Sequence, residues 1–214
     1  MDRMASKVIT IAQQKGGAGK TTVAIHLALA WHAMGRSVAL VDIDPQGSLS
    51  RWFEQRKAVT GKTVPPVTTV AGWRAGSEIE RVRQTADIVV VDSPPHAETE
   101  AKTVIRAADL VVIPVQPSPL DLWASRPTIE LAKQERRKMV VVLNRVSPRS
   151  LLAAEMAEAA AGLGAELATA RLGNRSSFAA AIAQGQGVGE TAPGSIAARE
   201  ASKLAREILR RAGI

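Results

Sequence analysis

Short apolar runs alternate along this chain with longer stretches in which apolar positions follow helical spacing. The clearest runs are Val8–Ala12, Val38–Val41, Ile88–Val91, Leu110–Val115 and Met139–Leu143. A strand that is apolar at nearly every position is typical of a parallel sheet covered by helices on both faces. We therefore expect an α/β fold with a mostly parallel, twisted sheet between two layers of helices.

Caps, glycines and prolines set the boundaries of the other expected elements. Gly35 is a stop signal for a helix over 20–34. Ser77 is expected to cap a short helix, and Asp121 to cap a helix over 121–135. Further strands are expected at Ser37–Asp42, Val67–Ala71, Asp87–Asp92 and Leu167–Leu172, further helices over 48–58 and 194–211, and a glycine-rich loop over Gly185–Gly189. A chain of 214 residues is expected to form one domain, 1–214.

The first apolar run leads into the segment Gln13-Gln14-Lys15-Gly16-Gly17-Ala18-Gly19-Lys20-Thr21-Thr22, after which a helix begins. Glycines here let successive backbone N–H groups turn toward phosphate oxygens, and the helix start adds the positive end of its dipole. Lys20 is expected against the β- and γ-phosphates, and the Thr21 hydroxyl on Mg²⁺. The segment predicts a nucleoside triphosphate site formed by Gly16, Gly17, Ala18, Gly19, Lys20, Thr21 and Thr22.

Carboxylates follow two of the buried runs. Asp42 and Asp44 lie two positions apart at the end of one strand, so both side chains can approach the same magnesium–phosphate cluster. Asp92 ends the Ile88–Val91 run. Ligands bind at the carboxyl ends of the strands in such folds. Asp42, Asp44 and Asp92 are therefore candidate metal-handling residues together with Thr21.

Three segments resemble a known family. In Lys15-Gly16-Gly17-Ala18-Gly19-Lys20-Thr21 an early lysine is present, and Gln14 stands where the usual phosphate loop has glycine; this resembles the deviant Walker A loop of the ParA/MinD class of P-loop ATPases. Asp42-Ile43-Asp44-Pro45-Gln46 is similar to the Walker A′ segment of ParA-type proteins, and Asp92-Ser93-Pro94-Pro95 to their second metal-handling element. The resemblance covers almost the whole chain and is most specific in these motifs.

The resemblance implies an ATPase that binds ATP and Mg²⁺ and closes into a homodimer with the nucleotides sandwiched between its subunits. It implies that Lys15 reaches the partner's nucleotide, that Asp44 orients or activates the attacking water, and that Asp42 supports the metal site. The catalytic candidates are Lys15, Lys20 and Asp44. Further nucleotide contacts are implied at Pro117, Asn144 and Arg145.

The composition adds a charge signal and several exclusions. The formal net charge is +8 and the pI is about 10.4, which favours a polyanionic partner, either nucleic acid or an anionic membrane. The chain has no cysteine and no tyrosine, which argues against iron–sulfur, arsenite-handling and tyrosine-autophosphorylating relatives. No apolar run is long enough to span a membrane and no signal peptide is evident, so a cytoplasmic protein is expected.

The clearest basic pattern lies on the last expected helix. Basic residues spaced four, three and four apart form one stripe, and Ala197, Ala201, Leu204 and Ile208 form another. In one interpretation the stripe is an ordinary solvated surface that Glu200 and Glu207 neutralise in part, but the overall positive charge favours a polyanionic partner. Such a surface fits phosphate contacts to nonspecific DNA. The candidate DNA-binding residues are Arg199, Lys203, Arg206 and Arg210, extended by Arg171 and Arg175.

The leading hypothesis from the sequence is a nucleoid-associated ParA-type ATPase that partitions or positions a cargo. Its implied partners are a second copy of itself, nonspecific DNA, and a ParB-like or cargo adaptor that stimulates hydrolysis. The alternative is a MinD-like ATPase that binds anionic membrane through its C-terminal helix. Membrane binding is the weaker hypothesis because the apolar stripe is alanine-rich and has no aromatic residue. A metabolic enzyme of the same superfamily would need a second substrate pocket, for which no motif is evident.

Overall fold

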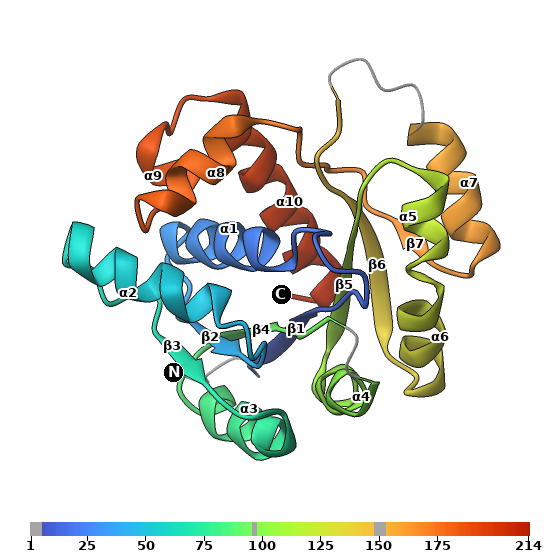
Figure 1. The fold of residues 1–214 in the computed structure, drawn as a ribbon, viewed down its shortest axis with the longest axis horizontal. Helices are drawn as coiled ribbons and strands as arrows, with labels where there is room; N and C mark the ends of the chain where they lie inside the picture. The colour runs from blue at the N-terminus through green and yellow to red at the C-terminus, as the bar shows by residue number, and fades with distance from the viewer. Residues whose placement is uncertain (1–5, 96–97, 148–152) are drawn as a thin grey trace.

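A parallel sheet lies at the centre of the molecule (Figure 1), seen in a computed structural model that describes residues 6–95, 98–147 and 153–214. Its seven strands have the order β3-β2-β4-β1-β5-β6-β7. All the strand pairs are parallel. The strands are β1 (Lys7–Ile11), β2 (Val38–Asp42), β3 (Val67–Thr69), β4 (Ile88–Asp92), β5 (Leu110–Val115), β6 (Lys138–Leu143) and β7 (Glu166–Leu167).

Helices cover both faces of this sheet, as the apolar strands require. They are α1 (Lys20–Ala33), α2 (Ser48–Thr60), α3 (Ala75–Arg83), α4 (Glu98–Ala107), α5 (Pro119–Trp123), α6 (Arg126–Gln134), α7 (Ala153–Gly162), α8 (Ser176–Ala183), α9 (Val188–Thr191) and α10 (Ile196–Ala212), with a 3₁₀ turn η1 at Gly72–Arg74. Alternate strand residues point to opposite faces. Ile9 and Val90 pack toward α1 and α10, whereas Val8 and Val89 pack toward α3 and α4.

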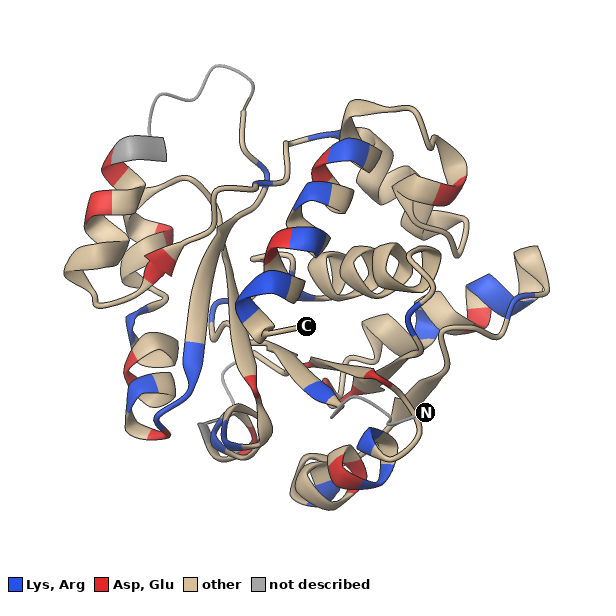
Figure 2. Ribbon diagram, turned by 180° about the vertical axis from the view of Figure 1, so that it is seen from behind, with Lys and Arg blue, Asp and Glu red and all other residues tan. Residues whose placement is uncertain are grey.

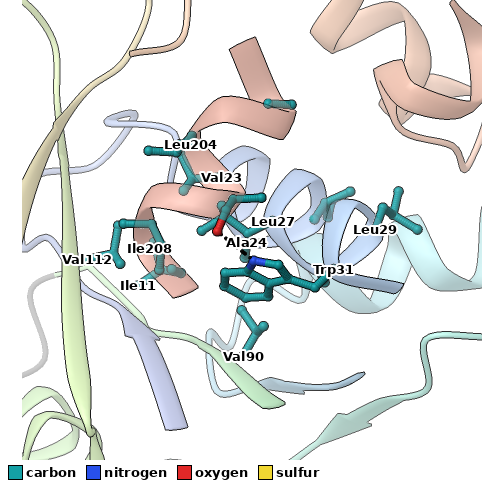
Figure 3. Packing of buried hydrophobic residues seen from close by; sticks show 14 of the residues in the cluster. Ile11, Val23, Ala24, Leu27, Leu29, Trp31, Val90, Val112, Leu204 and Ile208 are labelled. Carbon is teal, nitrogen blue, oxygen red and sulfur yellow. Dashed lines mark hydrogen bonds between the residues drawn. The ribbon is translucent and has the colours of Figure 1, made fainter. Parts of the chain in front are cut away.

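Helix α10 is joined to α1 by a buried contact (Figure 3). The Trp31 side chain is fully buried, and its Nε1 donates a 2.9 Å hydrogen bond to the Ala205 carbonyl oxygen. Leu204 and Ile208 of α10 are buried in the same cluster as Leu27 of α1. A buried indole with its N–H satisfied fixes one helix against the other. The apolar stripe of α10 is therefore part of the core.

The register of the central strands brings the candidate site residues to one edge. Asp92 at the end of β4 is paired with Ile11 of β1 on one side and with Asp42 of β2 on the other. The chain leaves β1 at this edge and enters the glycine-rich segment, from which α1 begins at Lys20. The phosphate loop, Asp42 and Asp92 thus meet at the carboxyl end of the sheet.

The expected fold class is confirmed, and four local predictions were wrong. Ser77 lies inside α3, which begins at Ala75. The helix expected over 121–135 is divided into α5 and α6, and Ser118 rather than Asp121 caps α5, because the prolines end β5 and the Ser118 side chain accepts a hydrogen bond from Asp121 N. The strand expected at Leu167–Leu172 is only the two-residue β7. The loop expected over Gly185–Gly189 already contains the start of α9 at Val188.

Candidate functional site

The phosphate loop joins β1 to α1, and two of its glycines adopt backbone conformations that other residues disfavour. Gly17 has φ 75° and Gly19 has φ 91°, both in the left-handed region that side chains disfavour. A Cβ on Gly19 would also collide with the Asn144 side-chain amide. Gly19 O then accepts a 2.9 Å hydrogen bond from Val23 N, which starts the helix. The loop wraps the N-terminus of α1, where anions bind most favourably.

Asn144 supports the loop from β6. Its Nδ2 donates a 2.9 Å hydrogen bond to the Ala18 carbonyl oxygen, and its Oδ1 accepts one from Arg145 N at 3.0 Å. Only 3% of Asn144 is exposed. The structure thus places Asn144 directly under the phosphate loop, and the nucleotide contact that the resemblance implies for it stays a prediction. The neighbouring Arg145 is exposed and has φ 56°.

Thr21 and Asp92 form the part of the site with the chemistry of a magnesium ligand set. Thr21 Oγ1 donates a 2.7 Å hydrogen bond to Asp92 Oδ2. Asp92 Oδ1 is buried and has no hydrogen-bond partner among the described residues. Burial raises the pKa of the Asp92 carboxyl to about 7, reinforced by Asp42 and Asp44 and opposed by Thr21 and Lys20. Hydroxyl and carboxylate oxygens suit Mg²⁺, and that cation would restore charge to a buried acid with a free oxygen.

Lys20 is almost fully buried at the first position of α1. Burial lowers the pKa of its ammonium group, while the negative charges of Asp92 and Asp44 act in the opposite direction. A buried cation at a helix N-terminus, where the first N–H groups have no partner within the helix, attracts phosphate strongly. These contacts fit the phosphate role predicted for Lys20.

Asp42 and Asp44 point to different tasks despite their spacing. The fully buried Asp42 carboxylate accepts hydrogen bonds from Ser50 Oγ at 2.6 Å, Ser50 N at 2.9 Å and Asp44 N at 3.2 Å. Its oxygens therefore hold α2 and the Asp44 turn, a contact that no local sequence signal predicts. Asp44 is partly exposed, and its Oδ1 accepts a 2.9 Å hydrogen bond from Gln46 N. Of the two acids, Asp44 is the one that faces open space.

An open cleft of about 390 Å³ lies over these residues. Its lining includes Gly16, Gly19, Lys20, Thr21, Asp44 and Arg145, so the structure brings most of the predicted nucleotide-binding residues to one place. Pro117 does not line it. Throughout residues 6–95, 98–147 and 153–214, no three histidine or acidic side chains converge to hold a metal ion. Mg²⁺ at this cleft would therefore depend on phosphate oxygens in addition to Thr21 and Asp92.

The front of the loop is fastened to the segment from β5 to α6. Lys15 Nζ lies 2.7 Å from Asp121 Oδ1 on α5. Gln14 N donates to Thr128 Oγ1, and Gln116 Nε2 donates to the Gly17 carbonyl oxygen, each at 3.4 Å. No role beyond a helix cap was predicted for Asp121, because the pairing spans more than a hundred residues. These contacts hold the loop on either side of Lys15 against that segment within the single chain.

The basic residues predicted on the last helix are distributed along α10 (Figure 2). Lys203, Arg206 and Arg210 are exposed and have no ion pair with any described residue. Arg199 is exposed and donates to the Gly194 carbonyl oxygen at 2.6 Å. Arg171 is also exposed. The structure therefore presents a continuous row of cations on this helix.

The acids of α10 form their ion pairs with arginines outside that row. Glu207 accepts hydrogen bonds from Thr169 N and Ala170 N and pairs with Arg211. Glu200 pairs with Arg175 at 2.7 Å and accepts a hydrogen bond from Gly173 N. Arg175 is consequently taken up by a partner and does not extend the exposed row as predicted. Both acids serve as anchors for the segment between β7 and α8.

No helix among the described residues is both long and apolar enough to pass through a membrane.

Comparisons with known proteins agree with this geometry. A family model described as the CobQ/CobB/MinD/ParA nucleotide binding domain matches residues 9–188. The maintenance of carboxysome distribution protein A of Halothiobacillus neapolitanus is 33% identical over 208 residues, which cover 94% of this chain and 95% of that protein. The chromosome-partitioning ATPase Soj of Thermus thermophilus is 28% identical over 237 residues, with 95% of each chain covered.

Solved structures show the same fold. MinD of Pyrococcus horikoshii, complexed with Mg-ADP, has a TM-score of 0.81 at 21% identity, covering 97% of this chain and 98% of that one. The ATP complex of a McdA variant from Cyanothece has a TM-score of 0.76 at 18% identity, covering 98% of this chain and 97% of that one. The family match over residues 9–188 shows that this chain belongs to the CobQ/CobB/MinD/ParA family of nucleotide-binding domains.

Proposed function

We propose that this protein is a dimerising ATPase that binds nonspecific DNA when ATP is bound and thereby positions or partitions a cargo. The observation that carries the proposal is the exposed row of cations on α10, whose Lys203, Arg206 and Arg210 have no ion pair among the described residues, in a chain whose phosphate loop has the early Lys15. The loop supplies a nucleotide-dependent state, and the row supplies a surface for a polyanion. A protein that uses both can attach to DNA in one nucleotide state and leave it in the other.

At the nucleotide, each residue has a separate task. Lys20 and the backbone N–H groups of the loop bind the β- and γ-phosphates. Thr21 and Asp92 would hold Mg²⁺, which offsets negative charge on the phosphates when it is bound. Asp44, the acid that faces the cleft, orients the attacking water. Lys15 reaches the nucleotide of the partner subunit, so the dimer is favoured only while the triphosphate is present.

At α10, the cations meet DNA phosphates and read no bases. Arg206 lies between Lys203 and Arg210 on one face, and the three have no internal counter-charge among the described residues. Contacts of this type give affinity without sequence preference and depend steeply on salt. Two copies in a dimer would present two such rows, which raises avidity for one duplex. The protein would then reside on the nucleoid.

The cargo is proposed from the relatives' names. One relative is named for the distribution of carboxysomes and another for chromosome partitioning. Both names describe placing a large object inside a cell. We infer a cargo-bound adaptor that stimulates ATP hydrolysis and so releases the protein from DNA.

A membrane-binding function has less support. The fold similarity to MinD is high, but the apolar stripe of α10, with Leu204 and Ile208, is buried against α1 and the sheet. A bilayer would need that stripe free, and freeing it would open the core. Lipid could meet only the cationic face.

The test is binding of the purified protein to a nonspecific duplex and, in parallel, to anionic liposomes with ATP, ADP or no nucleotide. The proposal predicts salt-sensitive DNA binding that requires ATP, without liposome binding. Liposome binding without DNA binding would overturn it in favour of the membrane function. Binding to neither would leave only the ATPase part of the proposal.

A further inference from the structure

Lys15 is not free in the single chain. Its Nζ lies 2.7 Å from Asp121 Oδ1 on α5. The Asp121 side chain is only 12% exposed, whereas that of Lys15 is 41% exposed. The carboxylate is therefore the fixed member of the pair, and the lysine is the member that can swing away.

The surrounding contacts hold Asp121 in position. Ser118 caps α5, and its side chain accepts a hydrogen bond from Asp121 N. Hydrogen bonds attach the loop on either side of Lys15 to the same β5–α6 segment. Gln14 N donates to Thr128 Oγ1, and Gln116 Nε2 donates to the Gly17 carbonyl oxygen. Asp121 thus belongs to a frame built against the front of the phosphate loop. The frame therefore fixes the acceptor of the pair, and only the Lys15 side chain must move for the pair to open.

We propose that Asp121 is a positioning residue that restrains Lys15 within its own subunit, and that ATP-driven dimerisation requires Lys15 to exchange this carboxylate for the partner's phosphates. The inference rests on the proposed function, which gives Lys15 its role across the dimer. Asp121 has no other ion pair within the described residues. When Lys15 leaves, a largely buried carboxylate loses its counter-charge, which opposes dimerisation.

The restraint is modest, as a switch requires. Because Lys15 is partly exposed, its ion pair with Asp121 is screened by water, and the expected gain from removing it is about threefold to tenfold in the dimer dissociation constant. Asp121→Asn keeps the size of the side chain and removes its charge. The matched control is Glu130→Gln, which removes the same charge from an exposed acid on α6 that pairs only with Lys133 among the described residues.

The first readout is the reactivity of the Lys15 amine in nucleotide-free protein, measured by acetylation and mass spectrometry of the loop peptide. Asp121→Asn should label Lys15 faster than the wild type or Glu130→Gln. Equal labelling rates in all three proteins would overturn the inference, because the ion pair with Asp121 would then not limit the reactivity of the Lys15 amine.

The second readout is dimerisation, measured by sedimentation with the slowly hydrolysed analogue ATPγS or with ADP. Asp121→Asn should dimerise with ATPγS at about threefold to tenfold lower concentration than the wild type and remain monomeric with ADP, while Glu130→Gln behaves like the wild type. Unchanged or weaker dimerisation of Asp121→Asn, with faster Lys15 labelling, would overturn the inference. If the wild type and all variants stay monomeric with ATPγS while labelling still responds, the proposed function fails first and its dependent inference with it.

Discussion

The phosphate loop and helix α10 treat their cations in opposite ways. At the loop, Lys15 is paired with Asp121, and the buried Lys20 lies under the influence of Asp92 and Asp44. On α10, Lys203 and its neighbours along the exposed face have no such partners among the described residues, although the helix carries acids. Those acids turn to backbone N–H groups and to Arg175 and Arg211.

This difference indicates what each region needs from outside. The loop is organised by contacts within the chain, so it can bind nucleotide with little rearrangement. The row on α10 repels itself and gains most from an external polyanion. The two regions are joined by α1, which begins at the loop and packs on α10 through Trp31. Variants at the loop, at this joint and at the row separate the three contributions.

The largest effect is expected at the loop. Lys20→Ala removes a buried cation from the phosphates and should weaken ATP binding by about 100-fold or more, because charge-assisted contacts of this kind contribute roughly 3 kcal/mol. Calorimetric titration of ATP measures this. Lys138→Ala, which removes an exposed lysine at the start of β6, is the control and should bind normally. Normal ATP affinity in Lys20→Ala would refute the phosphate site.

In α1, the helix that joins the loop to α10, the buried His26 makes the free energy of unfolding depend on pH. Burial lowers the pKa of His26 to about 4, and its Nδ1 donates a 2.8 Å hydrogen bond to the Thr22 carbonyl oxygen. The unfolded chain takes up the proton near pH 6.5, the folded chain only near 4. The contribution of His26 to the free energy of unfolding is therefore complete above pH 6.5. It is lost as the pH falls from 6.5 to about 4, and the total loss is about 3 kcal/mol.

Urea unfolding between pH 7.5 and 4 measures this loss in the wild type and two variants. His26→Leu should lose less stability over this range than the wild type, although it starts lower. His32→Leu changes an exposed histidine of the same helix and should follow the wild-type curve. An identical pH dependence in all three proteins would exclude His26 as the source.

A second variant at the nucleotide site should lose ATP hydrolysis and keep ATP binding. Asp44→Ala removes the acid that faces the cleft while leaving Lys20 and Thr21 in place, so ATP binding should persist and hydrolysis should slow by about 100-fold. Phosphate release with and without DNA measures the turnover. Glu158→Ala, an exposed acid on α7, should hydrolyse ATP at the wild-type rate. Unchanged turnover in Asp44→Ala would remove Asp44 from its role.

The smallest effect is expected at the row. The triple variant of Lys203, Arg206 and Arg210 to alanine should bind nonspecific DNA about tenfold more weakly and lower the log–log salt slope by about 0.9 for each phosphate that is no longer neutralised. The control triple replaces Lys57, Lys102 and Lys138, which lie on α2, α4 and β6 and carry the same charge. Equal salt slopes for the two triples would place the DNA surface elsewhere.

The sequence predicted the local parts of this molecule well. The apolar runs were predicted as strands because a strand that is apolar on both faces is typical of a parallel sheet covered by helices. The phosphate loop was predicted because its glycines determine the local backbone conformation by themselves. The sequence did not predict the side-chain contacts that join separate elements. The contacts of Asn144 with Ala18 and of Asp121 with Lys15 join segments more than a hundred residues apart, and that of Asp42 with Ser50 joins the end of β2 to the start of α2. The cap predicted at Ser77 was wrong because α3 continues directly from the 3₁₀ turn at Gly72–Arg74, and Ser77 Oγ donates a hydrogen bond back to the Arg74 carbonyl oxygen.

The most direct test of the coupling between loop and row is thermodynamic linkage between ATP and DNA. The measurement is the affinity of the Asp44→Ala protein for ATP with and without a saturating nonspecific duplex, beside its affinity for the duplex with and without ATP. Because coupling is reciprocal, each ligand should tighten the other by the same factor, and that factor should be well above one. A DNA affinity that is the same with and without ATP would contradict the account, since the nucleotide would then not control attachment to DNA.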